Sequence, residues 1–415
     1  MSRLAKRLLS DDPLIRSMSY QSVLSAFGEG SFLTGSAVYF TQIVGLSAAQ
    51  VGLGLTIAGL VTFLFAVPLG KTADRFGTLR TWTVGGAVQA ALFAAWTLVG
   101  NFAFYVVATI ALELVQTWMR TGRNAYRLDV FPREQRVRSN AYMRASRNVG
   151  YTLGALAGGL ALAADSDTLV EAIPLVTAAI LLVNTFWVSQ LPPIPHAHAE
   201  PVMEQAVEHA NEVRSALRNR GFLAATFFDG VLSTHQVLLN TVIPLWLVEQ
   251  TDAPRVLLAW LFGTNTVMAV ALQVAAARGV SDVPTSLRAE RRGAFCFVLS
   301  CVIVLLTHDT TGWLTIGLVW LGHVTVTGAE LFQSAGQWGL QSELSDPKRR
   351  AEYQGAAQLG YTLGTVWAPA AYTFVAMNWG ATGWLLIGAV IVLAAVCVQP
   401  SARAAERFLN PARAR

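Results

Sequence analysis

The segment G-K-T-A-D-R-F-G-T-L-R, residues 70–80, separates two long apolar runs at residues 48–69 and 81–99. Each run is long enough to cross the hydrocarbon core of a bilayer, which takes roughly 20 apolar residues in a helix. The segment between them holds one acid, Asp74, and three cations. Short loops rich in lysine and arginine between membrane helices lie on the cytoplasmic side. The segment therefore predicts a cytoplasmic loop between two transmembrane helices.

The composition of the whole chain indicates a membrane protein. Of its 415 residues, 53% are hydrophobic and 13% are charged, whereas about 25% of the residues of a soluble protein are charged. Apolar runs predict twelve spans, at residues 18–43, 48–69, 81–99, 102–127, 140–163, 168–190, 221–248, 255–277, 293–307, 312–340, 353–376 and 381–399. An even number of spans returns the C-terminus to the side of the N-terminus.

The distribution of cations predicts the orientation of these spans. If the N-terminus is cytoplasmic, 29 of the 30 lysine and arginine residues fall in cytoplasmic segments or at cytoplasmic helix ends, and only Arg255 does not. The positive-inside rule therefore supports both the number of spans and their orientation. We expect a multi-pass protein of the bacterial cytoplasmic membrane with both termini in the cytoplasm.

Sequence features argue against several other functional classes. The net charge of +5 is small and is spread over short loops, so nucleic acid is not an expected partner. No G-x-x-x-x-G-K-[ST] motif is present, so ATP does not bind through a P-loop. The three cysteines lie inside apolar runs and predict packing rather than a disulfide or metal site. The histidines at 196, 198 and 209 could bind a metal but are typical of a solvated linker, so we expect no metal and no cofactor.

Similar motifs recur in the same order in the two halves of the chain. Residues 27–34 match 227–234, residues 74–80 match 282–288, and residues 150–154 match 360–364. Three ordered matches with a slowly changing offset indicate a duplicated unit. We expect residues 1–190 to form one six-helix bundle, residues 191–220 a cytoplasmic linker, and residues 221–415 a second six-helix bundle with a short cytoplasmic tail.

The loop at residues 70–80 resembles the signature of the major facilitator superfamily, G-x-x-x-D-R-x-G-x-x-R, between helices 2 and 3. The matching residues are Gly70, Asp74, Arg75, Gly77 and Arg80. The resemblance covers the chain from the first span to the last. It implies an all-α membrane protein with twelve transmembrane helices in two pseudo-symmetric bundles, which carries a small molecule by alternating access and is not an enzyme.

The resemblance also implies a conformational latch at this loop. The resemblance implies that Asp74 bonds near the cytoplasmic end of helix 11 and helps to latch the outward-facing state. An acid at a helix N-terminus is favoured by the free N–H groups and the helix dipole. The alternative is a solvated acid in a turn.

Four glycines of the fifth span form a second motif. Gly150, Gly154, Gly158 and Gly159 are similar to a signature of proton-coupled drug exporters in this superfamily, with Ala155 in place of its proline. The pattern favours export. Small residues at every fourth position also allow close packing of helices, which would explain the glycines without export.

Ionisable residues inside the predicted spans are the candidates for proton coupling or substrate binding. Glu29 is the first choice because it lies roughly 16 Å along the first span, between two glycines. The other candidates are its counterpart Asp229 and the residues Glu113, His323 and Glu330. Charge inside a membrane usually faces a partner or a water-filled cavity. The alternative for Glu29 is a structural acid bonded to a neighbouring hydroxyl or amide.

Together these features predict a secondary transporter. We expect proton-coupled export of a hydrophobic or amphiphilic compound by a monomer in the lipid bilayer. The alternatives are a proton-coupled importer, a facilitator of a small nutrient, and a non-transporting membrane sensor.

Overall fold

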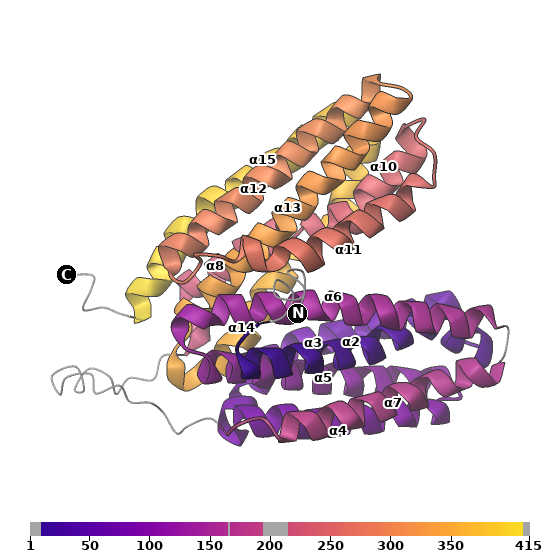
Figure 1. Ribbon diagram of the computed structural model, residues 1–415, viewed down its shortest axis with the longest axis vertical. Helices are drawn as coiled ribbons and strands as arrows, with labels where there is room; N and C mark the ends of the chain where they lie inside the picture. The colour runs from indigo at the N-terminus through magenta and orange to yellow at the C-terminus, as the bar shows by residue number, and fades with distance from the viewer. Residues whose placement is uncertain (1–9, 165–166, 194–214, 410–415) are drawn as a thin grey trace. The chain divides into compact units, whose positions relative to one another are not determined.

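The computed structural model describes residues 10–164, 167–193 and 215–409, which form helices, turns and no strand. The histidines at 196, 198 and 209 and most of the predicted linker lie outside the described residues. Figure 1 shows the order of the helices from indigo at the N-terminus to yellow at the C-terminus.

All twelve predicted spans are helical. The first six are α2 (Pro13–Val38) with a π turn (Tyr39–Ile43), α3 (Ala48–Phe76), α4 (Thr78–Ala95), α5 (Phe102–Val130), α6 (Arg133–Ala163) and α7 (Asp167–Ser189). The seventh combines α8 (Arg220–Leu232), α9 (His235–Val237), a π turn (Leu238–Val242) and α10 (Ile243–Gln250). The others are α11 (Leu257–Ala276), α12 (Val283–Leu305), α13 (Trp313–Glu343), α14 (Arg350–Thr365) and α15 (Ala368–Leu409).

Gly380 divides α15 into the end of the eleventh span and the whole of the twelfth. Its φ of 50° and ψ of −122° are not helical. A positive φ is a conformation that glycine adopts at little cost because it has no Cβ. The turn at Gly380 thus separates two spans that otherwise read as one helix.

Seven helical stretches of the described chain are long and apolar enough to cross a membrane by length and composition alone. α2, α4, α6 and α12 are not among them. α2, α6 and α12 carry Glu29, Arg147 and Glu290 within their lengths, and these three residues belong to the site described below.

The predicted loop at residues 70–80 is almost entirely helical, which corrects the expectation of a polar loop. α3 continues to Phe76 and α4 begins at Thr78, so Gly77 alone separates them. The φ of Gly77 is 97°, a value that suits glycine. Polar residues extend α3 beyond the apolar run because nothing before Gly77 breaks the helix. α12 also begins earlier than its predicted span, at Val283 instead of residue 293.

The chain divides into two compact units. The N-terminal unit comprises Met1–Pro132, Tyr142–Val213 and Pro347–Gly355, and the C-terminal unit comprises Arg133–Ala141, Arg214–Asp346 and Ala356–Arg415. Each unit thus includes the first residues of a helix, α6 or α14, whose remainder belongs to the other unit.

Aromatic side chains fill the core of each unit. In the N-terminal unit Phe40 packs against Trp96 and Tyr105, with ring centroids 4.8 and 4.9 Å apart. In the C-terminal unit the buried rings of Trp246 and Trp384 meet edge to face at 5.5 Å. Such pairs add attraction beyond the burial of their surface.

Glycines bring α6 into backbone contact with α2. A Cβ at Gly154 would lie 2.2 Å from the carbonyl oxygen of Phe27, and one at Gly150 would lie 2.3 Å from that of Val23. A Cβ at Gly158 would also be close to backbone, whereas one at Gly159 would meet nothing within 4 Å. Three of the four glycines of the predicted exporter motif therefore serve close helix packing.

The C-terminal unit repeats this contact. A Cβ at Gly364 of α14 would lie 2.6 Å from the carbonyl oxygen of Phe227 in α8. Gly364 and Phe227 are the counterparts of Gly154 and Phe27 in the sequence repeat. The same pair of helices is thus in contact at the same motif in both units.

We predict that Gly154→Ala destabilises the protein by about 1–3 kcal/mol, because its Cβ requires the backbones of α2 and α6 to separate. Gly159→Ala is the matched control, and it leaves stability unchanged or slightly raised because alanine favours helix. Thermal unfolding of the purified variants in detergent measures both. Equal stability of the two variants would contradict the contact.

Candidate functional site

Glu29 of α2 forms an ion pair with Arg147 of α6. The Arg147 Nη2 lies 3.3 Å from Glu29 Oε2, and 24% and 21% of the two side chains are exposed. The Tyr151 hydroxyl also donates to Glu29 Oε2, and Arg147 Nη2 donates to that hydroxyl at 2.6 Å. Ser25 Oγ donates to Glu29 Oε1 at 3.2 Å. We call these four residues the Glu29 centre.

A second cation besides Arg147 lies near Glu29. Arg123 of α5 also lies within electrostatic range of Glu29 and is buried. Cations and hydrogen-bond donors around a carboxyl favour its ionised form. Because the ion pair is partly exposed, a proton or a cationic ligand can compete with Arg147 for the carboxylate.

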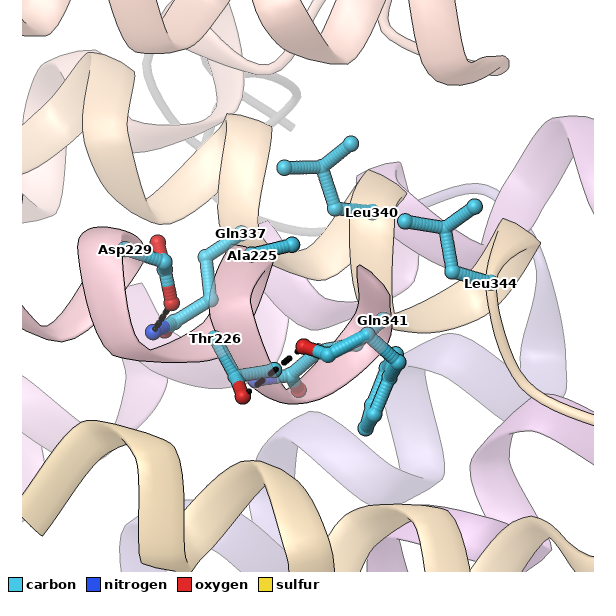
Figure 2. Close-up of a pocket in the computed structure, with 8 residues that line it drawn as sticks. Ala225, Thr226, Asp229, Gln337, Leu340, Gln341 and Leu344 are labelled. Carbon is cyan, nitrogen blue, oxygen red and sulfur yellow. Dashed lines mark hydrogen bonds between the residues drawn. The ribbon is translucent and has the colours of Figure 1, made fainter. Parts of the chain in front are cut away.

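Asp229 of α8 has a different environment, formed by amides. Gln333 Nε2 donates to Asp229 Oδ1 at 2.6 Å and Gln337 Nε2 donates to Oδ2 at 2.6 Å. Figure 2 shows Gln337 reaching from α13 to the carboxyl of Asp229. Gln333 is in turn bonded through Oε1 to the ring of the buried His235, at 3.3 Å.

Glu290 of α12 completes this arrangement and was missed by the sequence analysis. Its side chain is 0% exposed, and its carboxyl is within hydrogen-bonding reach of that of Asp229. Neither oxygen of Glu290 has another hydrogen-bond partner in the described structure. A Cβ at residue 336 would lie 2.7 Å from Glu290 Oε1, so Gly336 leaves room for this carboxyl.

The pair of Asp229 and Glu290 lacks a counter-charge. Among the described residues no lysine or arginine pairs with either carboxyl. Two ionised carboxylates side by side in a water-poor interior repel strongly, so one proton is retained between them. The two amides that donate to Asp229 favour the ionised form of that carboxyl, and Glu290 has no such donor among the described residues.

A small cavity leads away from Asp229 between α8 and α13. Its volume is about 10 Å³, enough for about one water molecule. Figure 2 shows the lining residues, which are Phe222, Ala225, Thr226 and Asp229 of α8 together with Gln337, Leu340, Gln341 and Leu344. The cavity extends toward the start of α8 and the end of α13, the ends that the sequence predicts to be cytoplasmic.

The other three candidates have surroundings of their own. Glu330 of α13 accepts from Asn265 at 2.9 Å and from Gln236 at 3.3 Å. His323 is 1% exposed, beside the backbone of Leu261. Glu113 of α5 is partly buried and forms no hydrogen bond or ion pair with the described residues.

Asp74 contacts the N-terminus of α14. Its Oδ1 accepts from the backbone N–H of Ala351 at 2.9 Å and its Oδ2 from that of Glu352 at 2.8 Å. A Cβ at Gly70 would lie 2.3 Å from the carbonyl oxygen of Ala351, so glycine allows the close approach. The contact implied by the family resemblance is therefore present, and its role as a latch stays a prediction.

The cations of this motif take no part in the contact. Arg75 and Arg80 are exposed and have no hydrogen bond or ion pair within the described chain. Arg350, at the start of α14, pairs instead with Asp129 of α5. The start of α14 is thus bound by two acids of the N-terminal unit, Asp74 and Asp129.

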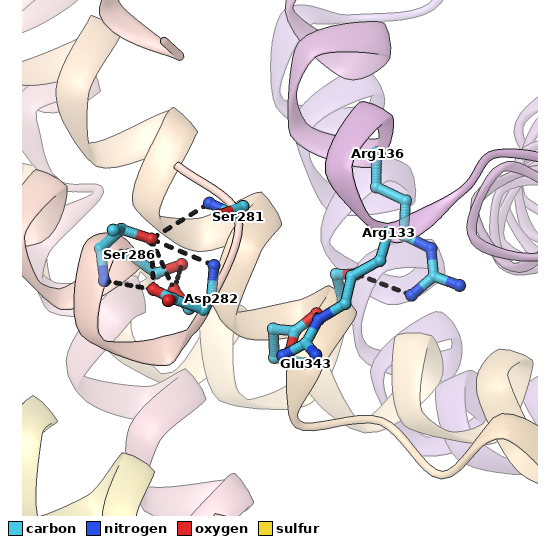
Figure 3. Close-up of polar contacts among 8 residues, drawn as sticks. Arg133, Arg136, Ser281, Asp282, Ser286 and Glu343 are labelled. Atoms are coloured by element: carbon cyan, nitrogen blue, oxygen red, sulfur yellow. Dashed lines mark hydrogen bonds and ion pairs between the residues drawn. The ribbon is translucent and has the colours of Figure 1, made fainter. Parts of the chain in front are cut away.

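The second copy of the motif acts differently in the C-terminal unit. Asp282 caps α12 by accepting from the N–H of Thr285 at 2.8 Å. Hydrogen bonds from the Thr285 side chain and backbone hold the pKa of Asp282 below its usual value. The start of α6 is bound by Glu343, which pairs with Arg133 (Figure 3). Asp282 therefore caps its own helix, and Arg133 of α6 lies within its electrostatic range.

Sequence comparisons find two membrane transporters. The chain is 25% identical over 376 residues to the class C tetracycline resistance protein of Escherichia coli, covering 86% of this chain and 88% of that protein. It is 23% identical over 389 residues to a Na⁺, Li⁺, K⁺/H⁺ antiporter of Planococcus maritimus, with the same coverage.

Structure comparisons find transporters of the same fold. A bacterial homologue of the iron transporter ferroportin in an outward-facing state aligns over 94% of this chain and 99% of that chain, with a TM-score of 0.69 and 14% identity. The transporter FucP in its outward conformation aligns over 94% and 97%, with a TM-score of 0.66 and 15% identity.

These findings confirm the predicted fold of twelve transmembrane helices in two pseudo-symmetric six-helix bundles. Proteins of this fold and family are multi-pass membrane transporters of small molecules and are not enzymes. Because the family model matches residues 19–369, the chain belongs to the Major Facilitator Superfamily.

Proposed function

We propose that this transporter exports hydrophobic or amphiphilic small molecules across the cytoplasmic membrane in exchange for protons. The observation that carries the proposal is the buried pair of Asp229 and Glu290, with which no cation in the described part of the chain pairs. The relatives support it by their described activities, which are tetracycline resistance and the exchange of alkali cations for protons.

The carboxyl pair supplies the proton-binding step. When the shared proton leaves this buried pair, two negative charges remain in a poorly solvating interior. The unprotonated pair therefore favours a conformation that gives it water or a cationic ligand. The cavity beside Asp229 is the route by which the proton leaves toward the cytoplasm.

The Glu29 centre supplies the second step. Glu29 bonds to Arg147 when no ligand is present, and its partial exposure makes it reachable. A proton or the cationic group of a substrate displaces Arg147 from the carboxylate. Proton and substrate therefore compete for the same carboxylate, that of Glu29. This competition is a simple basis for exchange.

Rocking of two bundles about a central site gives alternating access. We propose that both termini and the linker are cytoplasmic, as the cation distribution indicates, and that the protein works as a monomer. Uptake is the alternative, because a structural neighbour is described as a proton:xylose symporter.

The direct test is transport by the full chain in proteoliposomes. With an imposed pH gradient, acid in the lumen, we expect a hydrophobic cation such as ethidium to accumulate inside from the medium, driven by proton exit. Tetracycline and sodium are the further substrates to test, because of the relatives. Accumulation that requires the opposite gradient would indicate symport and contradict the proposal.

We predict that Glu290→Gln lowers transport driven by a pH gradient at least about tenfold, because the amide mimics a permanently protonated carboxyl. Exchange of labelled for unlabelled substrate without a gradient is retained, because it needs no deprotonation. Gradient-driven uptake and counterflow, measured in the same proteoliposomes, report on coupled transport and on exchange respectively.

Glu249→Gln is the control for this variant, since Glu249 is an exposed acid of α10, and it leaves both rates unchanged. Normal gradient-driven transport by Glu290→Gln would exclude the pair from coupling. If Glu29→Gln alone shows the uncoupled behaviour, coupling resides in the Glu29 centre.

We predict that Asp74→Asn lowers the transport rate about five- to tenfold without affecting expression or insertion. Asp74 accepts from two backbone N–H groups of α14, one with each carboxylate oxygen, and an asparagine amide has only one acceptor oxygen and no charge. Asp282→Asn is the matched control at the second copy of the motif. It leaves transport unchanged because Asp282 accepts through Oδ1 alone, and asparagine can replace that single acceptor at an N-cap. Equal rates for the two variants would argue against a latch at Asp74.

A further inference from the structure

A groove on the surface of the C-terminal unit holds three arginines next to apolar side chains. It has a volume of about 470 Å³ and is lined by Arg288, Arg291, Arg292, Phe295 and Cys296 of α12 and by Phe332 of α13. The α12 residues follow one another at helical spacings of three and four, so they share one face of the helix. α12 and α13 pack side by side (Figure 1), and the groove lies between them.

The three guanidinium groups are not used by the protein. All three arginines are exposed, and within the described chain none makes a hydrogen bond or an ion pair. Asp282 lies within electrostatic range of Arg288 and is bonded to Thr285. The face therefore presents a concentrated positive charge without a counter-charge.

The order of residues along α12 matches the layers of a membrane leaflet. Arg288 lies about 8 Å from the start of the helix at Val283, and Phe295 lies about 10 Å further along the axis. Phe295 is 67% exposed. By the positive-inside rule this end of α12 is cytoplasmic, so the arginines lie at the depth of lipid headgroups and Phe295 at the depth of acyl chains.

We propose that this groove binds an anionic phospholipid of the cytoplasmic leaflet, with its phosphate among Arg288, Arg291 and Arg292 and an acyl chain along Phe295 and Phe332. Guanidinium groups bind phosphate oxygens through paired hydrogen bonds. Basic pockets between transmembrane helices on the cytoplasmic side are suited to anionic headgroups.

The apolar half of the groove identifies the phosphate as that of a lipid. A free phosphate ion would occupy the arginines alone and would gain nothing from Phe295, Cys296 or Phe332. A lipid uses both halves at once, because its headgroup and acyl chain are separated along the membrane normal as the arginines and aromatic rings are along α12.

Native mass spectrometry of the detergent-purified full chain tests the proposal. With equal amounts of phosphatidylglycerol and phosphatidylcholine of identical acyl chains, we expect the wild-type protein to retain phosphatidylglycerol. The variant Arg288→Gln/Arg291→Gln/Arg292→Gln loses this preference by about tenfold or more. Phe295→Ala weakens retention of the lipid.

A second triple variant, Arg278→Gln/Arg403→Gln/Arg407→Gln, is the control. It removes the same charge from exposed positions of the C-terminal unit outside the groove, and it keeps the preference. Equal loss in both variants would show a bulk charge effect and overturn the site. Full competition by inorganic phosphate would overturn its assignment to a lipid.

The chain's own Cys296 provides a measurement on the unmodified groove. With Cys397→Ser, and with Cys301 buried, Cys296 is the accessible thiol for a membrane-permeant maleimide. We expect slower alkylation in vesicles containing phosphatidylglycerol than in vesicles of phosphatidylcholine alone. Equal rates in the two vesicle types would overturn the proposal even if the arginine variants fail to fold.

Discussion

A membrane interior does not solvate charge, and this constraint shapes both units. An ionisable group there must be paired, bonded to dipoles or kept neutral. The N-terminal unit uses an ion pair, in which Glu29 meets Arg147 and the hydroxyl of Tyr151. The C-terminal unit uses amides, which donate to Asp229, and among the residues that the structure describes Glu290 has no partner but Asp229.

The two units thus share a framework and differ in charge. The contact of Gly154 with Phe27 recurs as that of Gly364 with Phe227, so equivalent helices approach at equivalent points. The ionisable groups beside these contacts differ between the units. Glu29 of the N-terminal unit meets the basic Arg147, whereas Asp229 of the C-terminal unit meets the acidic Glu290. A duplicated fold can in this way provide one site that responds to cationic ligands and another that responds to protons.

The same divergence is present at the helix ends. Asp74 binds the first N–H groups of α14, whereas its counterpart Asp282 caps its own helix. An aspartate satisfies free N–H groups equally well in either position. The two aspartates differ in the helix whose N–H groups they bind. Asp74 binds α14, which is distant in the sequence, whereas Asp282 binds its own helix, α12.

The sequence by itself determined the class of fold. Apolar length, the placement of cations and the repeated motifs predicted twelve helices and two related halves, because a bilayer imposes these patterns directly on the chain. The motif around Asp74 also pointed to its contact with the start of helix 11. The predicted loop at residues 70–80 was wrong in its extent, because a helix can continue into water after its apolar run has ended.

The tertiary structure decided which charged groups meet. Glu290 lies among Arg288, Arg291 and Arg292 in the sequence and before the apolar run that begins at residue 293, so the sequence pattern does not mark it as an interior acid. Because successive residues of a helix point in different directions, α12 turns its arginines outward and Glu290 inward. Arg147 lies 118 positions from Glu29, and Gln333 lies 104 positions from Asp229, so local sequence pattern does not encode these pairings.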